Sequence, residues 1–380
     1  MTIAMIPSII SCRLLRTLAG WAALIMIAGN IMAFEEEQGI AWLKAAGTVP
    51  PLEIPASAEA WKAQRANIRA LLWKMMGDLP PREAKPAATI VSREDKGDYF
   101  LEKFEFDNGA GETVKGYCFL PKSATPENRA PAILYCHWHG GQYDIGKQEM
   151  LQANATPVAA GPALAKKGYV VLGIDACCFG ERNGNGPDGK TQKGSNGEMT
   201  AAKFNLWMGR TLWGMIIRDD LMALDYLCAR KEVDPARIGV TGISMGSTRA
   251  WWIMALDDRP KAAVCVACMT RYQDLIRQGM LKSHGIYYFV PGLLKHFDTE
   301  AIIACAAPRP ILFMTGDQDG GSPISGVRTI GSIVSRVYSL HGADAANKFN
   351  NDIYPGVAHV YLPAMWDKTM AWMDRWVKGQ

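Results

Sequence analysis

The sequence has no marked excess of charge of either sign. Its 380 residues include 41 Lys and Arg against 37 Asp and Glu, a formal net charge of +4 at pH 7. It also has no long run of basic residues. Proteins that bind nucleic acid or anionic membranes concentrate basic charge in such runs or on one face. No nucleic-acid partner is therefore expected, and a small neutral molecule is favoured.

The sequence also lacks internal repeats and a full set of metal ligands. His137 and His139 stand two residues apart at the end of a predicted strand, a spacing that puts both side chains on one face. No third ligand follows them at a spacing typical of metal hydrolases. We expect no metal and no organic cofactor, with His137 packed in the core and His139 shaping the loop.

The first 33 residues differ in character from the rest. Arg13 and Arg16 precede an uncharged apolar run over 17–34, which contains the small-residue cleavage signal Ile31-Met32-Ala33. This pattern predicts a secretory signal peptide over 1–33 and a periplasmic or secreted mature protein. The run of about 18 residues also reaches the lower limit of a membrane span. An uncleaved membrane anchor is therefore the alternative, and membrane contact is expected only in that case.

Export makes the state of the cysteines a question. Most of those outside the signal lie in apolar strands or helices, where a free Cys behaves as a small buried hydrophobe. Free thiols are favoured, and a structural disulfide stays open as the alternative. Cys265 and Cys268 are both assigned to one strand, so their C-x-x-C spacing is a poor redox motif. The eight are Cys118, Cys136, Cys177, Cys178, Cys228, Cys265, Cys268 and Cys305.

Hydrophobic residues make up 49% of the chain, enough for a sizeable core. Residues 34–88 form a predicted helical extension interrupted by prolines. Residues 89–120 alternate as strands, and strands over 133–137 and 169–175 flank a helix over 161–167. This alternation predicts an α/β fold over 89–380, with a mostly parallel, doubly wound sheet and helices on both faces.

The most informative motif is Gly242-Ile243-Ser244-Met245-Gly246. An apolar strand precedes it and a helix over 247–256 follows it, which is the context of a nucleophile elbow. We expect the Ser244 backbone in a sparsely allowed region, with the glycines avoiding a Cβ clash. The Met245 amide, at the positive end of the helix, would then point to where an oxyanion forms.

A serine nucleophile needs a base and a carboxylate elsewhere in the chain. A strand over 310–315 runs into a loop that carries Asp317 and Asp319, and a strand over 348–354 is followed by His359. The chain order Ser, Asp, His, each at the end of a strand, is that of α/β-hydrolases. His284, His296 and His341 lack this context and are expected to be structural.

At these residues the chain resembles the α/β-hydrolase superfamily, in particular its acetyl-xylan-esterase-like and dienelactone-hydrolase-like branch. Matched onto the family's pattern, Asp319 is implied to be the triad acid, with Asp317 its neighbour. Gly141 would supply the second oxyanion amide. Besides the elbow, the motifs that carry the resemblance are 137–141 (His-Trp-His-Gly-Gly), 175–182 (Asp-Ala-Cys-Cys-Phe-Gly-Glu-Arg), 306–310 (Ala-Ala-Pro-Arg-Pro), 316–319 (Gly-Asp-Gln-Asp) and 356–359 (Gly-Val-Ala-His).

Two segments exceed what the bare fold needs. Residues 182–197 form a predicted Gly/Asn-rich loop, and 270–298 is an aromatic-rich insertion, which suggests pocket walls and cap insertions around the site. The pocket candidates are His139, Arg182, Tyr287 and Tyr288, with plain packing or ion pairing as the alternative. Residues 184–191 match Gly-x4-Gly-Lys-Thr, but without a strand directly before and a helix directly after, a surface loop is the better interpretation.

The resemblance implies acyl transfer to Ser244, with His359 as the base, Asp319 fixing its tautomer, and the amides of Met245 and Gly141 holding the oxyanion. The implied substrate is a carboxylic ester, with acetylated carbohydrate the first choice for an exported enzyme. The alternatives are a serine peptidase or lactone hydrolase of the same fold, or a non-catalytic binding protein on this scaffold.

Overall fold

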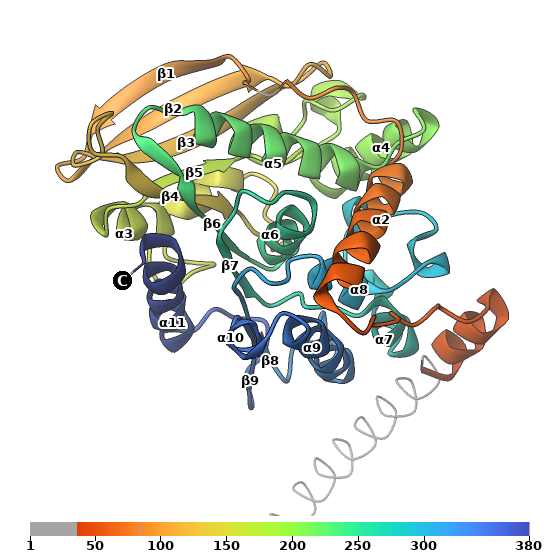
Figure 1. The fold of residues 1–380 in the computed structure, drawn as a ribbon. Coiled ribbons are helices and arrows are strands. Elements are labelled where there is room, and N and C mark those ends of the chain that lie inside the picture. The colour runs from red at the N-terminus through yellow and green to blue at the C-terminus, as the bar shows by residue number, and fades with distance from the viewer. Residues whose placement is uncertain (1–35, 84, 380) are drawn as a thin grey trace, which may run out of the picture.

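The computed structural model describes residues 36–83 and 85–379, and it contains one nine-stranded sheet (Figure 1). The strands lie in the order β1-β2-β3-β5-β4-β6-β7-β8-β9. Their bounds are β1 Ala88–Asp95, β2 Tyr99–Asp107, β3 Thr113–Pro121, β4 Ala130–Cys136, β5 Val170–Ile174, β6 Val233–Ile243, β7 Ala262–Val266, β8 Ile311–Gly316 and β9 Phe349–Tyr354.

The sheet divides into an antiparallel edge and a parallel body. β1, β2 and β3 form a meander in the region where the sequence predicts strands, and β3 pairs antiparallel with β5. From β5 through β4 to β9 every neighbouring pair is parallel. The chain order reverses beside β4, so the loops after β4 and β6 open at the kind of switch point where α/β proteins bind ligands.

Helices cover both faces of the sheet, as predicted (Figure 1). Alternation along β4 shows this: Ile133 packs in the cluster that includes α3 and α11, and Leu134 packs in the cluster that includes α5, α6 and α9. The helices are α2 Ala58–Met76, α3 Ala160–Lys166, α4 Gly194–Trp207, α5 Leu212–Ala229, α6 Met245–Leu256, α7 Tyr272–Arg277, α8 Thr299–Ala304, α9 Ile324–Ser339, α10 Ala343–Ala346 and α11 Pro363–Met373.

The N-terminal region consists of a helix over 36–46, a connection rich in proline, and α2. The side chain of Ser57 caps α2 by accepting the amide of Ala60 at 3.2 Å. Trp61 and Leu72 are fully buried in the same cluster as α5 and α8. The predicted helical extension is thus packed onto the α/β core, and the predicted signal peptide over 1–33 lies outside the described residues.

One predicted loop is wrong at its end. Residues 194–197 were expected to continue the loop, but α4 begins at Gly194. Glycine and asparagine are poor in a helix interior, yet the first turn tolerates them because its amides have no intrahelical acceptor. Burial of Glu198, Ala201 and Ala202 then fixes the helix, and this tertiary contribution is invisible in the local composition.

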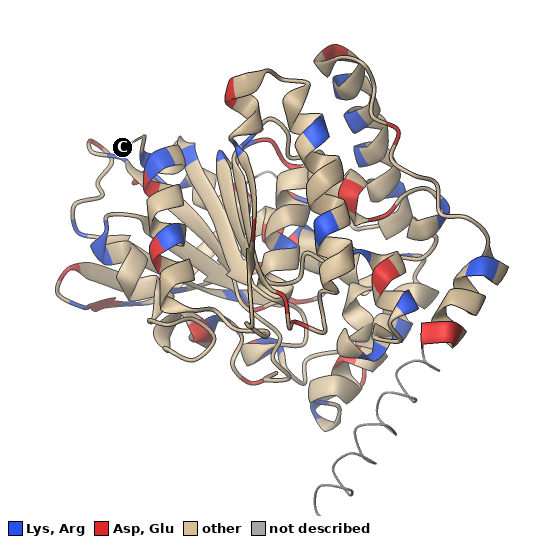
Figure 2. Cartoon of the chain, turned by 90° about the horizontal axis from the view of Figure 1, so that it is seen from below, with Lys and Arg blue, Asp and Glu red and all other residues tan. Residues whose placement is uncertain are grey.

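Charge lies mainly on the outer helices and loops. In the view of Figure 2 the strands are largely tan, and blue and red segments are interspersed on the surrounding elements. Among the described residues no helix is long and apolar enough to cross a membrane. The eight described cysteines are free thiols, all buried except the half-buried Cys228.

Candidate active site

Ser244 stands between β6 and α6 in a backbone conformation that residues with a Cβ seldom adopt. Its φ is 59° and its ψ is −121°, a region that costs roughly 1–3 kcal/mol. Its amide donates to the carbonyl oxygen of Val266 on β7 at 2.9 Å, and its carbonyl accepts the amide of Thr248 at 3.0 Å. The expected strained turn between strand and helix is confirmed.

The two glycines of the elbow are required by the backbone that passes beside them. A Cβ on Gly242 would lie 2.4 Å from the carbonyl oxygen of Cys136, and one on Gly246 would lie 2.0 Å from the same atom. Cys136 ends β4, the strand next to β6. The elbow therefore packs against the neighbouring strand so closely that neither position has room for a side chain.

A buried ion pair anchors the helix that follows the elbow. Arg249 on α6 donates to both carboxylate oxygens of Asp220 on α5, at 2.8 and 2.5 Å, and both side chains are buried. The same guanidinium reaches the carbonyl oxygen of His137 at 3.4 Å. This fixes the first turn of α6, where the Met245 amide has no acceptor within its own helix, against the loop after β4.

Asp319 and His359 meet at the ends of β8 and β9. The Nδ1 of His359 lies 2.9 Å from Oδ2 of Asp319. The other carboxylate oxygen of Asp319 accepts the amide of Gly321 at 3.0 Å. Asp319 is only 4% exposed, whereas His359 is half-buried. A buried acid that orients a more open imidazole is the arrangement in which the ring presents its second nitrogen to a reacting group.

Asp317, two residues earlier, has a different position. Its Oδ1 accepts the amide of Gly356 at 2.7 Å, which ties the loop after β8 to the turn just before His359. Asp317 therefore holds the backbone on which the histidine stands, while Asp319 contacts the ring. This difference separates two acids that the sequence places side by side.

Cys268 lies beside the elbow serine, a position that the sequence interpretation missed. Both cysteines of the C-x-x-C were assigned to one strand, but β7 ends at Val266, and Cys268 follows with a φ of 52°. Its Sγ lies 3.9 Å from Oγ of Ser244. Burial, and next the charge of Asp319, raise the pKa of this thiol to about 12. Cys268 is thus a neutral thiol beside Ser244 that also feels the charge of Asp319.

The loop after β4 is organised around His139. The amide of Gly141 donates to Nδ1 of His139 at 3.0 Å, and Nε2 lies 3.1 Å from a carboxylate oxygen of Glu198 on α4. The same oxygen accepts the hydroxyl of Tyr143 at 3.1 Å. Gly141 was expected to offer its amide to an oxyanion, but in this structure that amide is held by the His139 ring.

The aromatic insertion over 270–298 closes over this loop. Tyr287 stacks on His139, with ring centroids 5.2 Å apart, and both Tyr287 and Tyr288 are buried. Burial, and next the neighbouring Cys268 thiol, raise the pKa of Tyr287 well above its ordinary value. The insertion therefore lies near Cys268, whose Sγ is 3.9 Å from Oγ of Ser244.

His284, which the sequence assigned to a structural role, belongs to this region as well. Its Nε2 lies 3.0 Å from the carbonyl oxygen of Gly321, whose amide bonds Asp319. Its ring stacks on Tyr288 with centroids 4.6 Å apart. Burial lowers the pKa of His284, which favours the neutral ring. The sequence feature that could have placed His284 near the site is its position within the aromatic-rich insertion over 270–298.

Arg182 is engaged in ion pairs below the loops. It bonds Glu112 and lies 2.8 Å from the carboxylate of Asp219, and a third bond reaches the carbonyl oxygen of Asp175 at 3.1 Å. The residue is 3% exposed. These contacts place it in the ion-pair role that the sequence left open, because its donors face the protein rather than a pocket.

Two further motifs have ordinary structural roles. The segment 184–191 is separated from β5 by nine residues and is followed by α4 only at Gly194, so its amides do not lead directly into a helix. His137 is buried and accepts the amide of Ala176 at 3.0 Å, and burial lowers its pKa well below the ordinary value. Within the described ranges no group of three or more His, Cys, Asp or Glu side chains is arranged to hold a metal.

Comparison with known proteins places this geometry in a family. The sequence model of the Abhydrolase family matches residues 52–343. The chain belongs to this family. It is also 38% identical, over 282 residues, to YtaP of Bacillus subtilis (strain 168), a protein whose name assigns it only to the hydrolases. That match covers 73% of this chain and 89% of the relative.

Solved structures agree on the fold. A protein of Bacteroides fragilis NCTC 9343 described as an acetyl xylan esterase superimposes with a TM-score of 0.66 at 21% identity, covering 85% of each chain. A glucuronoyl esterase from Solibacter usitatus gives 0.62 at 18% identity, covering 86% of this chain and 98% of the other. The predicted α/β-hydrolase fold is confirmed, and at these identities the likeness extends to the fold alone.

Proposed function

We propose that this member of the abhydrolase family is a serine esterase in which Ser244 is the acylated nucleophile. The observation that carries the proposal is the strained backbone of Ser244 at the turn between β6 and α6. Such strain persists only where the surrounding structure holds it, and it is concentrated at functional sites. Here the close packing at Gly242 and Gly246 and the hydrogen bond from the Ser244 amide to Val266 hold the strained backbone in place.

In the proposed mechanism His359 takes the Ser244 proton and returns it to the leaving alcohol. Asp319 accepts a hydrogen bond from Nδ1–H of His359, so that Nε2 is the free base, and the carboxylate charge stabilises the imidazolium that forms. The 2.9 Å contact between these two residues supports the assignment of Asp319 over Asp317. Water then releases the acid by the same proton path.

The oxyanion that forms on the substrate needs hydrogen-bond donors that are already in place. The Met245 amide at the start of α6 is the first, and the helix dipole favours negative charge there. Gly141 is the second candidate, on condition that substrate binding releases its amide from the His139 ring. Substrate binding must therefore break the hydrogen bond from the Gly141 amide to Nδ1 of His139.

For the substrate we propose a small acyl ester of a carbohydrate, with acetyl as the acyl group. We expect the buried Tyr287 and Tyr288 to limit the acyl pocket to a short chain, and aromatic faces suit sugar rings. Acetyl xylan and glucuronoyl esterases share the fold. The apolar run over 17–34 supports export to the periplasm or medium, where such polymers are met.

A substrate panel tests the proposal. The purified protein is assayed on p-nitrophenyl acetate, acetylated xylan, a glucuronate methyl ester, a lactone and peptide p-nitroanilides, beside Ser244→Ala. We expect ester turnover that falls by about 10³-fold or more in the variant, with unchanged circular dichroism. Turnover of anilides alone would favour a peptidase, turnover of the lactone alone a lactone hydrolase, and no turnover a binding protein.

A further inference from the structure

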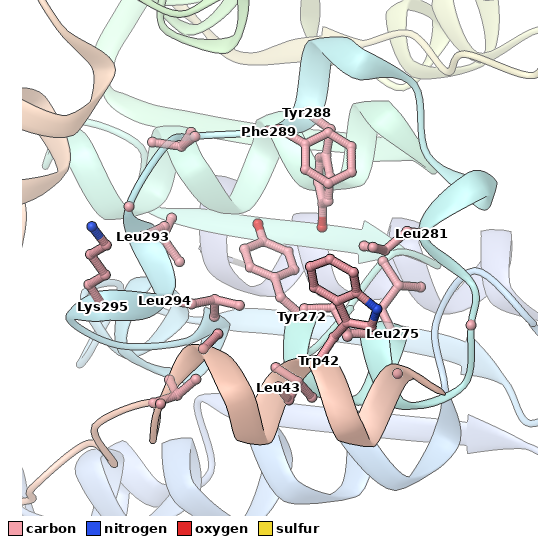
Figure 3. A pocket seen from close by; sticks show the side chains of 18 of the residues that line it. Trp42, Leu43, Tyr272, Leu275, Leu281, Tyr288, Phe289, Leu293, Leu294 and Lys295 are labelled. Atoms are coloured by element: carbon pink, nitrogen blue, oxygen red, sulfur yellow. The ribbon is translucent and has the colours of Figure 1, made fainter. Parts of the chain in front are cut away.

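A cavity lies apart from the candidate catalytic residues; we call it the second cavity to distinguish it from the region around Ser244. It has a volume of about 1010 Å³ and opens between the helix over 36–46 and the segment 272–295 (Figure 3). Ser244, Asp319 and His359 are not among its lining residues. Its walls are mostly aliphatic and aromatic, and include Trp42, Leu43, Leu275, Phe289, Leu293 and Leu294.

A close backbone contact joins the two walls of the cavity. A Cβ on Gly39 would lie 2.1 Å from the carbonyl oxygen of Ile276, so the helix over 36–46 touches the end of α7 backbone to backbone. Beyond that contact the helix stands away from the insertion, and Trp42 is 75% exposed above the cavity. A large apolar side chain at the rim of an apolar hollow leaves favourable contacts unmade, and a ligand in the hollow would make them.

The cavity also contains a buried hydroxyl that adjoins a second phenol, Tyr272. Tyr288 is 5% exposed, and its hydroxyl has no hydrogen-bond partner of ordinary geometry among the described residues. Figure 3 shows the hydroxyls of Tyr272 and Tyr288 pointing into the cavity. Burial, and next the adjoining Tyr272 phenol, raise the pKa of Tyr288 well above its ordinary value, so the hydroxyl keeps its proton. A buried donor of this kind is costly unless an acceptor meets it.

A positive charge lies at one end of the same cavity. Lys295 lines it, and Figure 3 shows its amine directed away from the labelled aromatic side chains. Together the walls offer an apolar body, a phenol donor inside and a cation at the edge. Small-molecule sites have this composition, with predominantly apolar walls and a few placed polar groups, and this volume is at the upper end of their range.

We propose that this cavity binds a single-chain amphiphile whose head group carries an acceptor oxygen, such as a medium-chain carboxylate. The chain lies along Trp42 and the leucines, and the head accepts the Tyr288 hydroxyl. The positive charge of Lys295, elsewhere on the cavity wall, favours an anionic ligand. This is a binding site beyond the proposed esterase activity. It requires no turnover, so its test is independent of whether Ser244 is a nucleophile.

Isothermal calorimetry with dodecanoate, below its aggregation concentration and with the full chain, measures the site directly. We expect one equivalent to bind. Trp42→Ala should weaken binding by about tenfold or more through loss of an aromatic anchor, and Tyr288→Phe by about 3- to 10-fold through loss of one hydrogen bond. The matched control is Trp207→Ala, because Trp207 is 93% exposed on α4 and outside the cavity; it should leave the affinity unchanged.

The head-group requirement has its own probe. Dodecyltrimethylammonium has the same chain but no acceptor oxygen and the opposite charge, and it should bind at least about tenfold more weakly. Absence of dodecanoate binding would overturn the proposal. So would several equivalents weakened equally by Trp42→Ala and Trp207→Ala, which would indicate adsorption to exposed side chains. Equal binding of both amphiphiles, or an unchanged affinity in Tyr288→Phe with an unaltered melting temperature, would also contradict it.

Discussion

The elbow around Ser244 and the cavity under the helix over 36–46 differ in how closely their side chains are packed. All twelve residues of α6 are buried, and the glycines beside Ser244 have no room for one more carbon. Around the cavity, by contrast, large apolar side chains such as Trp42 and Phe289 stand partly in solvent. The elbow is packed too closely to rearrange, whereas the cavity has room for a ligand.

The difference corresponds to what each region is proposed to do. A nucleophile and its oxyanion donors must be positioned before the substrate arrives, since reorganisation during the reaction would cost rate. A binding cavity for an amphiphile needs volume and a few polar groups, and tolerates looser walls. Four predictions test the contrast, beginning with the largest expected effect.

The two acids of the loop after β8 give the largest effect. Asp319→Asn should lower kcat by about 10³- to 10⁴-fold, because an amide in its place favours the wrong tautomer of His359. Asp317→Asn keeps an acceptor oxygen for the Gly356 amide and should cost less than about tenfold. Steady-state kinetics on p-nitrophenyl acetate measure both, and the reverse ranking would move the role of triad acid to Asp317.

Two glycines with the same steric conflict give the second prediction. Gly246→Ala and Gly39→Ala each bring a Cβ to 2.0–2.1 Å from a carbonyl oxygen. Gly246 faces the central sheet, which cannot yield, so its variant should lose about 3 kcal/mol or more of unfolding free energy. Gly39 faces only the end of α7, and its helix can move outward, so its variant should lose less than about 1 kcal/mol. Equal losses in urea unfolding would show that the peripheral helix is held as firmly as the elbow.

A buried carboxyl beneath the closely packed loop gives the third. Burial raises the pKa of Glu149 from 4.5 to about 7, against hydrogen bonds from the Tyr135 hydroxyl and the Trp138 amide. Between those two values the unfolded chain is ionised while the folded protein keeps the proton. The contribution of Glu149 to stability is therefore complete below about pH 4.5 and is lost as the pH rises through 7.

Glu149→Gln removes this titration. The unfolding free energy of the native protein minus that of the variant should fall as the pH rises from 5 to 7.5, by at most about 3 kcal/mol. Urea unfolding at several pH values measures it. A difference that stays constant with pH would mean that Glu149 is ionised throughout and that the packed region holds a charge.

Acyl length gives the smallest effect. If Tyr287 and Tyr288 wall off the site from the second cavity, overfilling the acyl pocket costs about 1–3 kcal/mol. Acetyl esters should then exceed octanoyl esters in kcat/KM by roughly ten- to a hundredfold. A rate that rises steadily with chain length would show that the two regions are connected and that the acyl group enters the apolar cavity.

The sequence was most informative where function depends on neighbouring residues. The elbow could be predicted from one motif because its parts are contiguous: the strand, Ser244, its two glycines and the following helix. The chain order of Ser244, Asp319 and His359, each after a predicted strand, indicated which strand ends form the site. Asp319 was selected over Asp317 only by resemblance, and the structure supplies the physical difference between them.

What could not be predicted depends on contacts between distant segments. Arg182 is buried by Glu112 and Asp219, from three different parts of the chain. His139 takes the Gly141 amide because Glu198 on α4 fixes its other nitrogen. The second cavity forms where 36–49 crosses 272–295, and neither segment carries a motif for it.

The central claim is that Ser244 carries the acyl group during turnover, and trapping that intermediate tests it most directly. The protein is mixed with excess p-nitrophenyl acetate, quenched in acid within milliseconds to seconds, and examined by intact and peptide mass spectrometry. We predict a mass increase of one acetyl group, located on the peptide that contains Ser244, and its absence in Ser244→Ala. Turnover with an acetyl group on another residue, or undiminished turnover in Ser244→Ala, would contradict the account.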